Sequence, residues 1–215
     1  MKNMITSLFR FHGEELEDVV QSCEKVYAGC LNKHDECTTS FVDCKLLQLL
    51  CIDTRPEKLL EIGTFVGTST YSLAAATKST GGIIYTCDNQ DEFFDAKCDL
   101  NYRIKTHPKT WSSDLLKQEE MLQGLDFVFN DANCSVEDCE QIYKLANDRL
   151  VFATHDYYDS NGYFAKGHDA IQSMLRVLEN KACKFKLYIP EKEWYFDGAY
   201  KGINGCTAVI TIIKQ

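Results

Sequence analysis

The sequence predicts an α/β domain with three layers, built around a mostly parallel, doubly wound sheet. Short apolar runs rich in β-branched and aromatic residues alternate along the chain with longer segments of helical spacing. This alternation favours parallel strands, because a parallel pair needs a crossover connection that is usually a helix. The chain has 215 residues, no internal repeat and no linker rich in Pro, Gly or Ser, which indicates one globular domain.

The N-terminal section, residues 1–53, is expected to be helical. Apolar residues recur at near-helical spacing over about 13–31, and a second helix, capped by Thr39 or Ser40, runs to about residue 52. Pro56 ends this section, and residues 54–215 are expected to form the ligand-binding core.

In the core, apolar runs between turn residues predict strands, and longer amphipathic segments predict helices. The expected strands span about 58–62, 83–87, 109–112, 126–130, 149–154, 185–189 and 207–213. The expected helices between them span about 69–78, 91–104, 115–123, 136–146 and 168–180.

A glycine turn follows the first of these strands. Residues 59–68 read Leu-Leu-Glu-Ile-Gly-Thr-Phe-Val-Gly-Thr, so Gly63 and Gly67 open a turn between a buried strand and a helix. Glycine accepts positive φ and has no Cβ, so a ligand can approach the backbone closely, and the next helix offers free N–H groups. The spacing Glu-x-Gly-x-x-x-Gly differs from the Gly-x-Gly-x-x-Gly fingerprint of dinucleotide-binding folds.

Asp88 closes the second strand of the core, after Ile-Ile-Tyr-Thr-Cys. In doubly wound sheets an acid at this position accepts hydrogen bonds from ribose hydroxyls, while the glycine turn lies beside it. This pair of features favours an adenosine-type ligand. The alternative is that Asp88 starts a turn or caps the next helix.

Polar groups end five successive strands of the predicted sheet. Ligands of such sheets bind outside the carboxyl ends of the strands, so these groups are expected to lie near one another. Any one of them could be a turn former or a helix cap, but the complete set indicates an enzyme. The groups are Glu61 with Gly63, Asp88, Ser113 with Asp114, Asn130 with Asp131, and His155 with Asp156.

Composition excludes several classes of function. The net charge is 23 − 32 = −9 with no dense basic cluster, which disfavours nucleic-acid partners. No apolar run approaches membrane-spanning length and no signal peptide is visible, so a cytoplasmic protein is expected. The eleven cysteines are odd in number and contain no Cys-x-x-Cys, so we expect reduced, buried thiols rather than disulfides or a zinc ribbon.

Taken in order, these motifs resemble those of class I S-adenosylmethionine-dependent methyltransferases. Residues 60–70 together with Asp88 look like the first two motifs. Residues 126–137 and 150–158 are similar to the fourth and fifth strand ends of small-molecule O-methyltransferases, such as the catechol and macrolide-sugar enzymes. The resemblance covers about residues 40–215. It implies a Rossmann-like sheet of seven strands with the last one antiparallel, and methyl transfer from S-adenosylmethionine to a hydroxyl of a small molecule.

The resemblance also implies roles for individual residues. Catalytic roles would fall to Asp131, His155 and Asp156, and Asp131 and Asp156 would be ligands of Mg²⁺, a cation that prefers oxygen and activates an acceptor hydroxyl. Residues that would bind the donor are Glu61, Gly63, Thr64, Gly67, Thr68, Ser69, Asp88, Ser113, Asp114 and Asp131.

The chain departs from the metal-dependent members at the fourth strand end. They carry Asp-Gly-x-His or Asp-His-x-Lys, whereas this chain has Asp131-Ala-Asn-Cys, and Tyr157 stands where a third metal ligand is often found. Metal dependence is therefore left open. His155 or His168 could supply the base instead, since imidazole titrates near neutral pH. Five aromatic residues could line an acceptor pocket or simply pack over the sheet: Tyr157, Tyr158, Tyr163, Trp194 and Tyr195.

Two other functions are compatible with the sequence. One is a nucleotide-dependent oxidoreductase, which the absence of a second early glycine disfavours. The other is a protein that binds the donor but has lost catalysis and serves as a scaffold, because the usual base is replaced. In relatives the N-terminal helices often cover the acceptor site or pair subunits, so a homo-oligomer is also an expectation.

Overall fold

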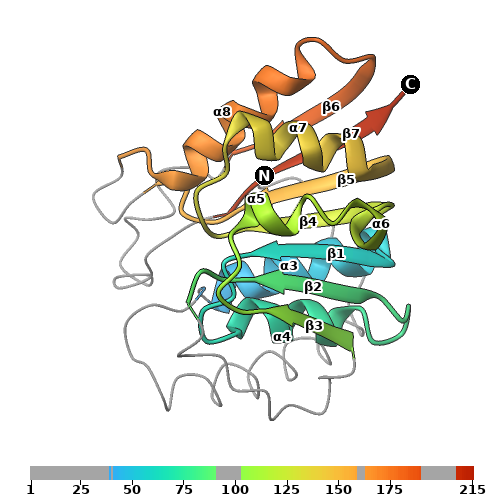
Figure 1. Cartoon of the computed structure of the whole chain (residues 1–215), viewed down its shortest axis with the longest axis vertical. Coiled ribbons are helices and arrows are strands. Elements are labelled where there is room, and N and C mark those ends of the chain that lie inside the picture. The colour runs from blue at the N-terminus through green and yellow to red at the C-terminus, as the bar shows by residue number, and fades with distance from the viewer. Residues whose placement is uncertain (1–38, 40, 91–102, 159–162, 190–206) are drawn as a thin grey trace.

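The computed structural model describes residue 39 and residues 41–90, 103–158, 163–189 and 207–215. Its centre is a seven-stranded sheet in the order β3-β2-β1-β4-β5-β7-β6 (Figure 1). The strands are β1 (Lys58–Ile62), β2 (Ile83–Cys87), β3 (Ile104–His107), β4 (Leu125–Asn130), β5 (Ala146–Thr154), β6 (Cys183–Tyr188) and β7 (Ala208–Lys214). All neighbours from β3 to β5 are parallel, and β7 runs antiparallel to both β5 and β6. The predicted Rossmann-like sheet with an antiparallel last strand is therefore confirmed.

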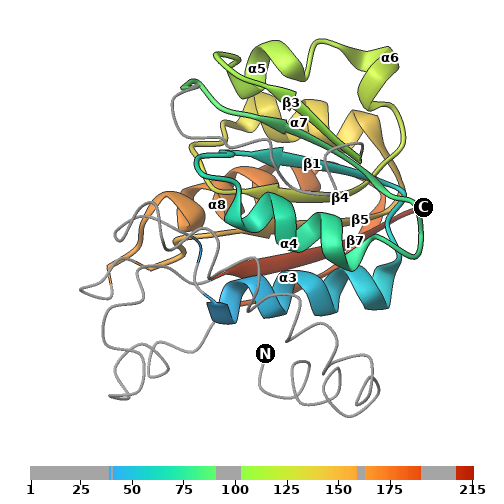
Figure 2. The ribbon, with the colours of Figure 1, turned by 90° about the horizontal axis from the view of Figure 1, so that it is seen from below.

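Helices cover both faces of the sheet. One face carries α3 (Phe41–Thr54) and α4 (Thr68–Ala76), and the other carries α5 (Ser112–Leu115), α6 (Glu119–Leu122) and α7 (Val136–Leu145) (Figure 2). The last helix, α8 (Lys166–Leu178), packs with α7 over β5 and β7. Successive side chains of β1 point to opposite faces of the sheet: Leu59 packs toward α3 and α4, whereas Leu60 packs toward α5–α8.

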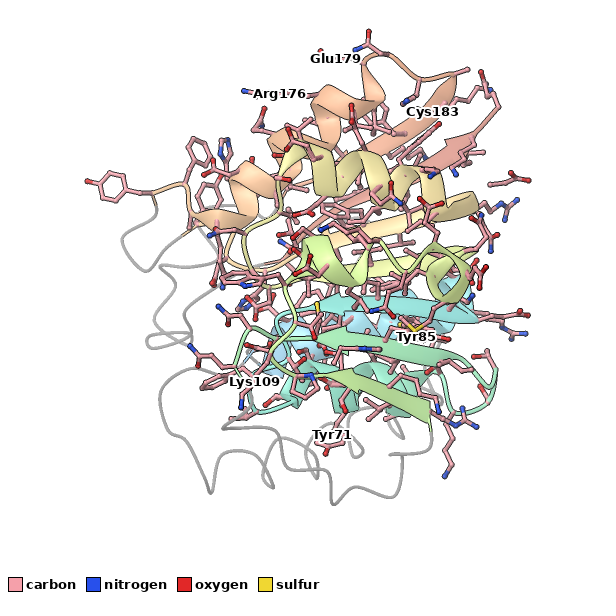
Figure 3. The ribbon with its side chains drawn as sticks, in the orientation of Figure 1. Tyr71, Tyr85, Lys109, Arg176, Glu179 and Cys183 are labelled. Atoms are coloured by element: carbon pink, nitrogen blue, oxygen red, sulfur yellow. The ribbon has the colours of Figure 1, made fainter. Side chains whose placement is uncertain are left out.

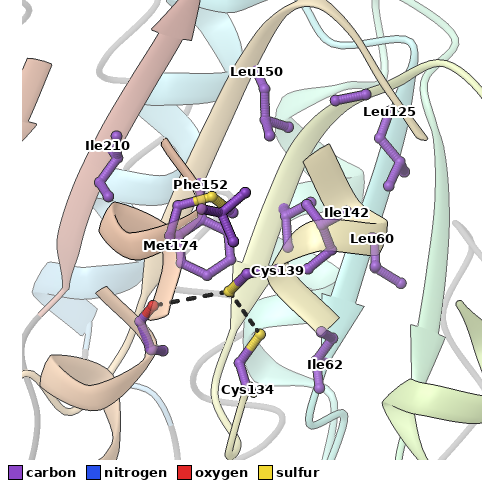
Figure 4. Close-up of a cluster of buried hydrophobic side chains, with 14 of the residues drawn as sticks. Leu60, Ile62, Leu125, Cys134, Cys139, Ile142, Leu150, Phe152, Met174 and Ile210 are labelled. Atoms are coloured by element: carbon purple, nitrogen blue, oxygen red, sulfur yellow. Dashed lines mark hydrogen bonds between the residues drawn. The ribbon is translucent and has the colours of Figure 1, made fainter. Parts of the chain in front are cut away.

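The core on the α7 and α8 side is the larger of two clusters of buried side chains (Figure 4). Phe152 of β5 and Met174 of α8 are fully buried there, beside Ile142 of α7. Cys134 and Cys139 lie in the same cluster with their sulfur atoms 3.5 Å apart, and Cys139 also points to the carbonyl of Ala170. The six described cysteines are free thiols and five of them are buried, as the sequence predicted for these positions.

The third strand and its neighbours were placed wrongly by the sequence. The strand spans Ile104–His107 rather than 109–112, because Ile104 pairs with Ile84 of β2 and places the only large apolar side chain of the segment against the sheet. The expected helix over 115–123 is two short helices, α5 and α6. The helix expected over 13–31 lies outside the described residues, and so does the one expected over 91–104 apart from its last two positions, where Ile104 begins β3 instead.

The surface of the described part of the chain is polar where the helices face outward. Arg176 of α8 and Glu179, which follows that helix, point away from the sheet, whereas Tyr85 belongs to β2 and is half-buried (Figure 3). Within the described residues, no helix combines the length and apolar character needed to cross a membrane.

Candidate active site

The turn after β1 has the backbone geometry that its glycines predicted. Gly63 has φ 95° and Gly67, the N-cap of α4, has φ 85°. A Cβ at Gly63 would lie 3.0 Å from the carbonyl oxygen of Asp131, which follows β4. Phe65 also has positive φ, 43°, an uncommon backbone conformation for an aromatic residue. The turn is therefore held tightly against the next strand end.

Glu61 lies beneath this turn and has no exposed surface. Its carboxylate accepts hydrogen bonds from Ser69 (2.6 Å), Thr70 and Thr86 (2.6 Å). Burial raises the pKa of Glu61 to about 7, although these hydroxyl hydrogen bonds oppose the shift. In this conformation Glu61 offers no atom to a ligand, so its predicted contact with the donor would require Ser69 or Thr70 to turn away. Its observed role is to fix α4 to the sheet.

Thr64 and Thr68 are also buried in this turn. Thr64 shares a 2.5 Å hydrogen bond with Thr86 of β2. The hydroxyl of Thr68, in the first turn of α4, finds no hydrogen-bond partner among the described residues. Together with Ser69, these residues join β1, β2 and α4, so the predicted donor-side residues do lie close together.

Asp88 closes β2 and reaches back to the glycine turn. Its Oδ2 accepts a 2.8 Å hydrogen bond from the backbone N–H of Phe65, and its Oδ1 accepts one of 2.9 Å from the N–H of Gln90. Each carboxylate oxygen keeps a further lone pair, and the side chain is only partly buried. Asp88 is thus adjacent to the turn, as its predicted contact with a ribose requires.

Ser113 and Asp114 do not directly follow a strand, contrary to the sequence-based expectation. They lie in α5, five residues beyond the end of β3, and both are exposed. Asp114 forms a surface ion pair of 2.7 Å with Lys117. The segment before α5 does return to the donor side, because Thr110 donates its N–H to the carbonyl of Asp88 at 2.9 Å.

His155, which follows β5, is buried and lies between three carboxylates, of which Asp43 is buried and Asp131 and Asp156 are partly exposed. Its Nδ1 is 3.1 Å from Asp131 and 3.2 Å from Asp156, and its Nε2 is 3.3 Å from Asp43 of α3. Burial alone would lower the pKa of His155, but Asp131 and Asp43 raise it well above its usual value. Asp43 is itself fixed by Thr207, whose N–H and hydroxyl donate at 2.9 and 2.8 Å.

Lys166, the first residue of α8, joins the same group of side chains and was not anticipated from the sequence. Its Nζ lies 2.9 Å from Oδ1 of Asp131, 3.0 Å from Oδ2 of Asp156, and 2.8 Å from the carbonyl oxygen of Asp131. Burial would lower the pKa of Lys166, but the two carboxylates raise it. Conversely, burial would raise the pKa of Asp131, but His155 and Lys166 lower it.

Asp156 has a strained backbone that the next helix holds in place. Its φ is 52°, a left-handed conformation uncommon for a residue other than glycine. Gly167 donates its N–H to the carbonyl of Asp156 at 3.0 Å, and a Cβ there would lie 2.0 Å from the carbonyl oxygen of His155. Only glycine fits this contact. The sequence offered no pattern that singled out Lys166 or Gly167.

Aromatic side chains adjoin the charged group. Phe164 stacks on His168 with ring centroids 4.0 Å apart, and Tyr158 stacks on Phe164 at 5.4 Å. Tyr157 meets Tyr158 edge-on at 4.9 Å and is almost fully buried, whereas Tyr163 is 71% exposed. Of the described members of the predicted aromatic set, Tyr157 and Tyr158 therefore pack together with Phe164 and His168, and Tyr163 is largely exposed. Trp194 and Tyr195 lie outside the described residues.

The predicted Mg²⁺ ligands converge but are already paired with cations. Asp131, His155 and Asp156 each place one ligand atom within 4.8 Å of the others. The two carboxylates, however, share the ammonium of Lys166 and the imidazole of His155. Mg²⁺ requires several free oxygen ligands and would be repelled by these cations. The arrangement found here does not fit a Mg²⁺ ion.

Comparison with known proteins gives one match to a family model. A family model described as a methyltransferase domain matches residues 60–157, which run from β1 to just beyond β5. No curated protein matches the chain in sequence. This match to a methyltransferase domain agrees with the resemblance to class I S-adenosylmethionine-dependent methyltransferases.

Solved O-methyltransferases share the whole fold. The Bacillus cereus O-methyltransferase in complex with S-adenosylhomocysteine is 23% identical, with a TM-score of 0.60 over 93% of this chain and 90% of that one. The O-methyltransferase TomG from Streptomyces achromogenes, in complex with S-adenosylmethionine, is 19% identical, with a TM-score of 0.59 over 98% and 96%. The Podospora anserina methyltransferase PaMTH1, bound to S-adenosylhomocysteine, is 14% identical, with a TM-score of 0.65 over 90% and 88%. At these identities the likeness concerns the fold.

Proposed function

We propose that the protein transfers the methyl group of S-adenosylmethionine to a hydroxyl of a small molecule. The observation that carries the proposal is the close approach of Gly63 to Asp131, with 3.0 Å between the carbonyl of Asp131 and the position of an added Cβ. Because of this close approach, the glycine turn after β1 lies directly beside the charged residues that follow β4 and β5. A donor lying along the turn would then end next to the groups that meet an acceptor.

On the donor side, the proposal assigns the ribose hydroxyls to Asp88. The Phe65 N–H holds one carboxylate oxygen of Asp88 at 2.8 Å, so the acid is oriented before a ligand arrives. Gly63 and Gly67 allow close approach of the donor's amino acid part, and the hydroxyl of Thr68 is a buried group still lacking a partner among the described residues. Ser113 and Asp114 of α5 are kept as candidates for the adenine end.

On the acceptor side, the proposal gives Asp156 the role of general base. S-adenosylmethionine supplies an electrophilic methyl carbon bound to a sulfonium. The new carbon–oxygen bond forms as the carbon–sulfur bond breaks with its electron pair left on sulfur, and the hydroxyl proton passes to Asp156. Asp156 suits this role because its side chain is 27% exposed, more than the 21% of Asp131, and because each of its oxygens keeps a lone pair besides its contact with His155 or Lys166. Asp131 and His155 position Asp156 rather than touch the acceptor.

His155 is thereby assigned a positioning role instead of the base role considered from sequence. Both of its ring nitrogens already face carboxylates, and its side chain is 5% exposed. A base needs a free lone pair directed at the acceptor. His168 stacks on Phe164 and, with Tyr158, belongs to the aromatic group that we propose packs against a planar, hydroxylated acceptor.

The first test is calorimetric titration of the full chain with S-adenosylmethionine, S-adenosylhomocysteine and NAD. We expect both S-adenosyl compounds to bind and NAD to leave no signal. Asp88→Ala should weaken donor binding by about 1–3 kcal/mol, the usual cost of removing the partner of buried polar groups. Asp148→Ala, an exposed acid near the other end of β5, is the matched control and should bind as the wild type does.

Binding of NAD instead of the S-adenosyl compounds would reject the proposal in favour of an oxidoreductase. If the donor binds, transfer is tested by incubating the protein with radiolabelled S-adenosylmethionine and a panel of catechols, other phenols and hydroxylated sugars. Donor binding without label transfer to any of them would favour the scaffold alternative.

A further inference from the structure

The ammonium of Lys166 has all of its hydrogen-bonding capacity used inside the protein. An ammonium group carries three N–H donors. Three acceptors surround this one: Oδ1 of Asp131 at 2.9 Å, Oδ2 of Asp156 at 3.0 Å, and the carbonyl of Asp131 at 2.8 Å. The lysine thus bridges the carboxylates that follow β4 and β5, as a bound metal ion would.

His155 makes the same bridge from the buried side. Its Nδ1 lies 3.1 Å from Asp131 and 3.2 Å from Asp156, so the two carboxylates are enclosed between two cationic groups. With both cations charged, Asp131, Asp156, Lys166 and His155 carry no net charge, and Asp43 on the other nitrogen of His155 adds one negative charge. A divalent ion entering between the carboxylates would be repelled by each cation and would have to displace the ammonium.

The fold keeps Lys166 in this position. Gly167 donates to the carbonyl of Asp156 at 3.0 Å and approaches the carbonyl of His155 so closely that a Cβ would overlap it. Beyond it, Ala170 and Ile171 are fully buried against the core. Because the backbone of α8 is fixed on both sides of this contact, only the side chain of Lys166 could move away.

We propose that Lys166 is a built-in counter-ion that takes the place of a divalent cation between Asp131 and Asp156, so that this site excludes Mg²⁺. The inference concerns the acceptor side of the proposed methyltransferase site, but it needs no donor. Its failure can therefore be told apart from a failure of the proposed function. It also makes a positive prediction: removing the ammonium should turn the two carboxylates into a cation site.

The test is titration of the full chain with Mn²⁺ alone, followed by the loss of the electron paramagnetic resonance signal of free Mn²⁺. Three lysine variants are compared with the wild type. Lys166→Met removes the charge but keeps the apolar stem, and Lys166→Arg keeps the charge. Lys117→Met removes an exposed lysine whose surface ion pair with Asp114 lies outside this group, and it serves as the control.

We expect Lys166→Met to bind Mn²⁺ at least about tenfold more tightly than the wild type, because one repelling charge has been removed next to two carboxylates. Lys166→Arg and Lys117→Met should bind it no better than the wild type. A one-to-one site of micromolar affinity in the wild type would overturn the inference. Equal binding by Lys166→Met and the wild type, with both folded by circular dichroism, would also overturn it.

A second measurement applies even if Lys166→Met does not fold. Reductive methylation of wild-type lysines, read by mass spectrometry, should modify Lys166 more slowly than the exposed Lys117, because its ammonium is bound on three sides. Millimolar Mg²⁺ should leave this difference unchanged. Faster labelling of Lys166 in Mg²⁺ would mean that the metal displaces the lysine, and the inference would be wrong.

Discussion

The two halves of the candidate site are built in different ways. The donor half, at the ends of β1 and β2, joins neutral hydroxyls and backbone N–H groups to partners only 8 to 25 residues away, from Ser69 with Glu61 to Thr86 with Glu61. The acceptor half, at the ends of β4 and β5, joins full charges from distant segments. Asp43 is 112 residues from His155 and 164 from Thr207.

This difference bears on how each half depends on the rest of the fold. The donor half needs one β-α-β unit, because its glycines and its hydroxyl network all lie within that unit. The acceptor half needs α3, α8 and the start of β7 to be docked at the same time, and each missing partner would leave a buried charge uncompensated. The acceptor half should therefore be the more sensitive to substitutions far from any ligand.

The largest expected effect is that of Gly167→Ala. An added Cβ would lie 2.0 Å from the carbonyl oxygen of His155, so β5 and α8 must separate. We expect a loss of about 4 kcal/mol or more in the free energy of unfolding, measured with urea. Gly81→Ala is the control, since Gly81, unlike the helical Gly167, has positive φ (78°), but nothing lies within 4 Å of its added Cβ. That variant should lose only about 1 kcal/mol from backbone strain, and similar losses in both would contradict the packing argument.

The next effect is that of Asp43→Ala, which removes one partner of the buried His155. We expect a loss of about 3 kcal/mol in the free energy of unfolding, because the imidazole keeps its burial but loses a carboxylate. Asp53→Ala, on the exposed side of the same helix, is the control and should change it little.

The Asp43–His155 pair should also make the free energy of unfolding depend on pH, in a direction that follows from the pKa of His155. The pKa of His155 is raised in the folded state, so its contribution to stability is fully present below its unfolded value of about 6.5. The contribution is lost as the pH rises through the higher folded-state pKa. Wild-type stability measured from pH 6 upward should therefore fall more steeply than that of Asp43→Ala, and parallel curves would argue against an Asp43–His155 ion pair.

The smallest expected effect is on the donor side and appears only as a change in pH dependence. The pKa of Glu61 rises from 4.5 to about 7 on folding. Because the folded state holds the proton longer, wild-type stability should decrease as the pH rises from 4.5 through 7, by about 2 kcal/mol between pH 5 and 7. Glu61→Gln should flatten this part of the curve. Glu57→Gln, which alters an exposed acid just before β1, should leave the curve as it is in the wild type.

Sequence alone determined the glycine turn and the strand-end acid of the donor half, and the alternation of strands and helices along the core. The strands at 58–62 and 83–87 were predicted with their observed bounds, because β-branched and apolar runs between glycines and charged residues are local signals. The turn at Gly63 and Gly67 and its neighbour Asp88 were predicted for the same reason: positive φ and a strand-end acid depend on the residues at those positions. The exception was β3, whose single apolar residue left too weak a pattern.

Only the tertiary structure decided what surrounds Asp131 and Asp156. The sequence marked both acids and His155 as strand-end groups, but it placed the last large helix from about residue 168, beyond Lys166 and Gly167. That helix begins after Ala165, whose side chain cannot form an N-cap hydrogen bond. The sequence therefore contains no capping signal that would mark the first residue of the helix. Whether two carboxylates face a metal, a lysine or water depends on which distant segments dock beside them. Contacts between residues 35 to 164 positions apart produce no periodic pattern in the sequence, so they could not be predicted from it.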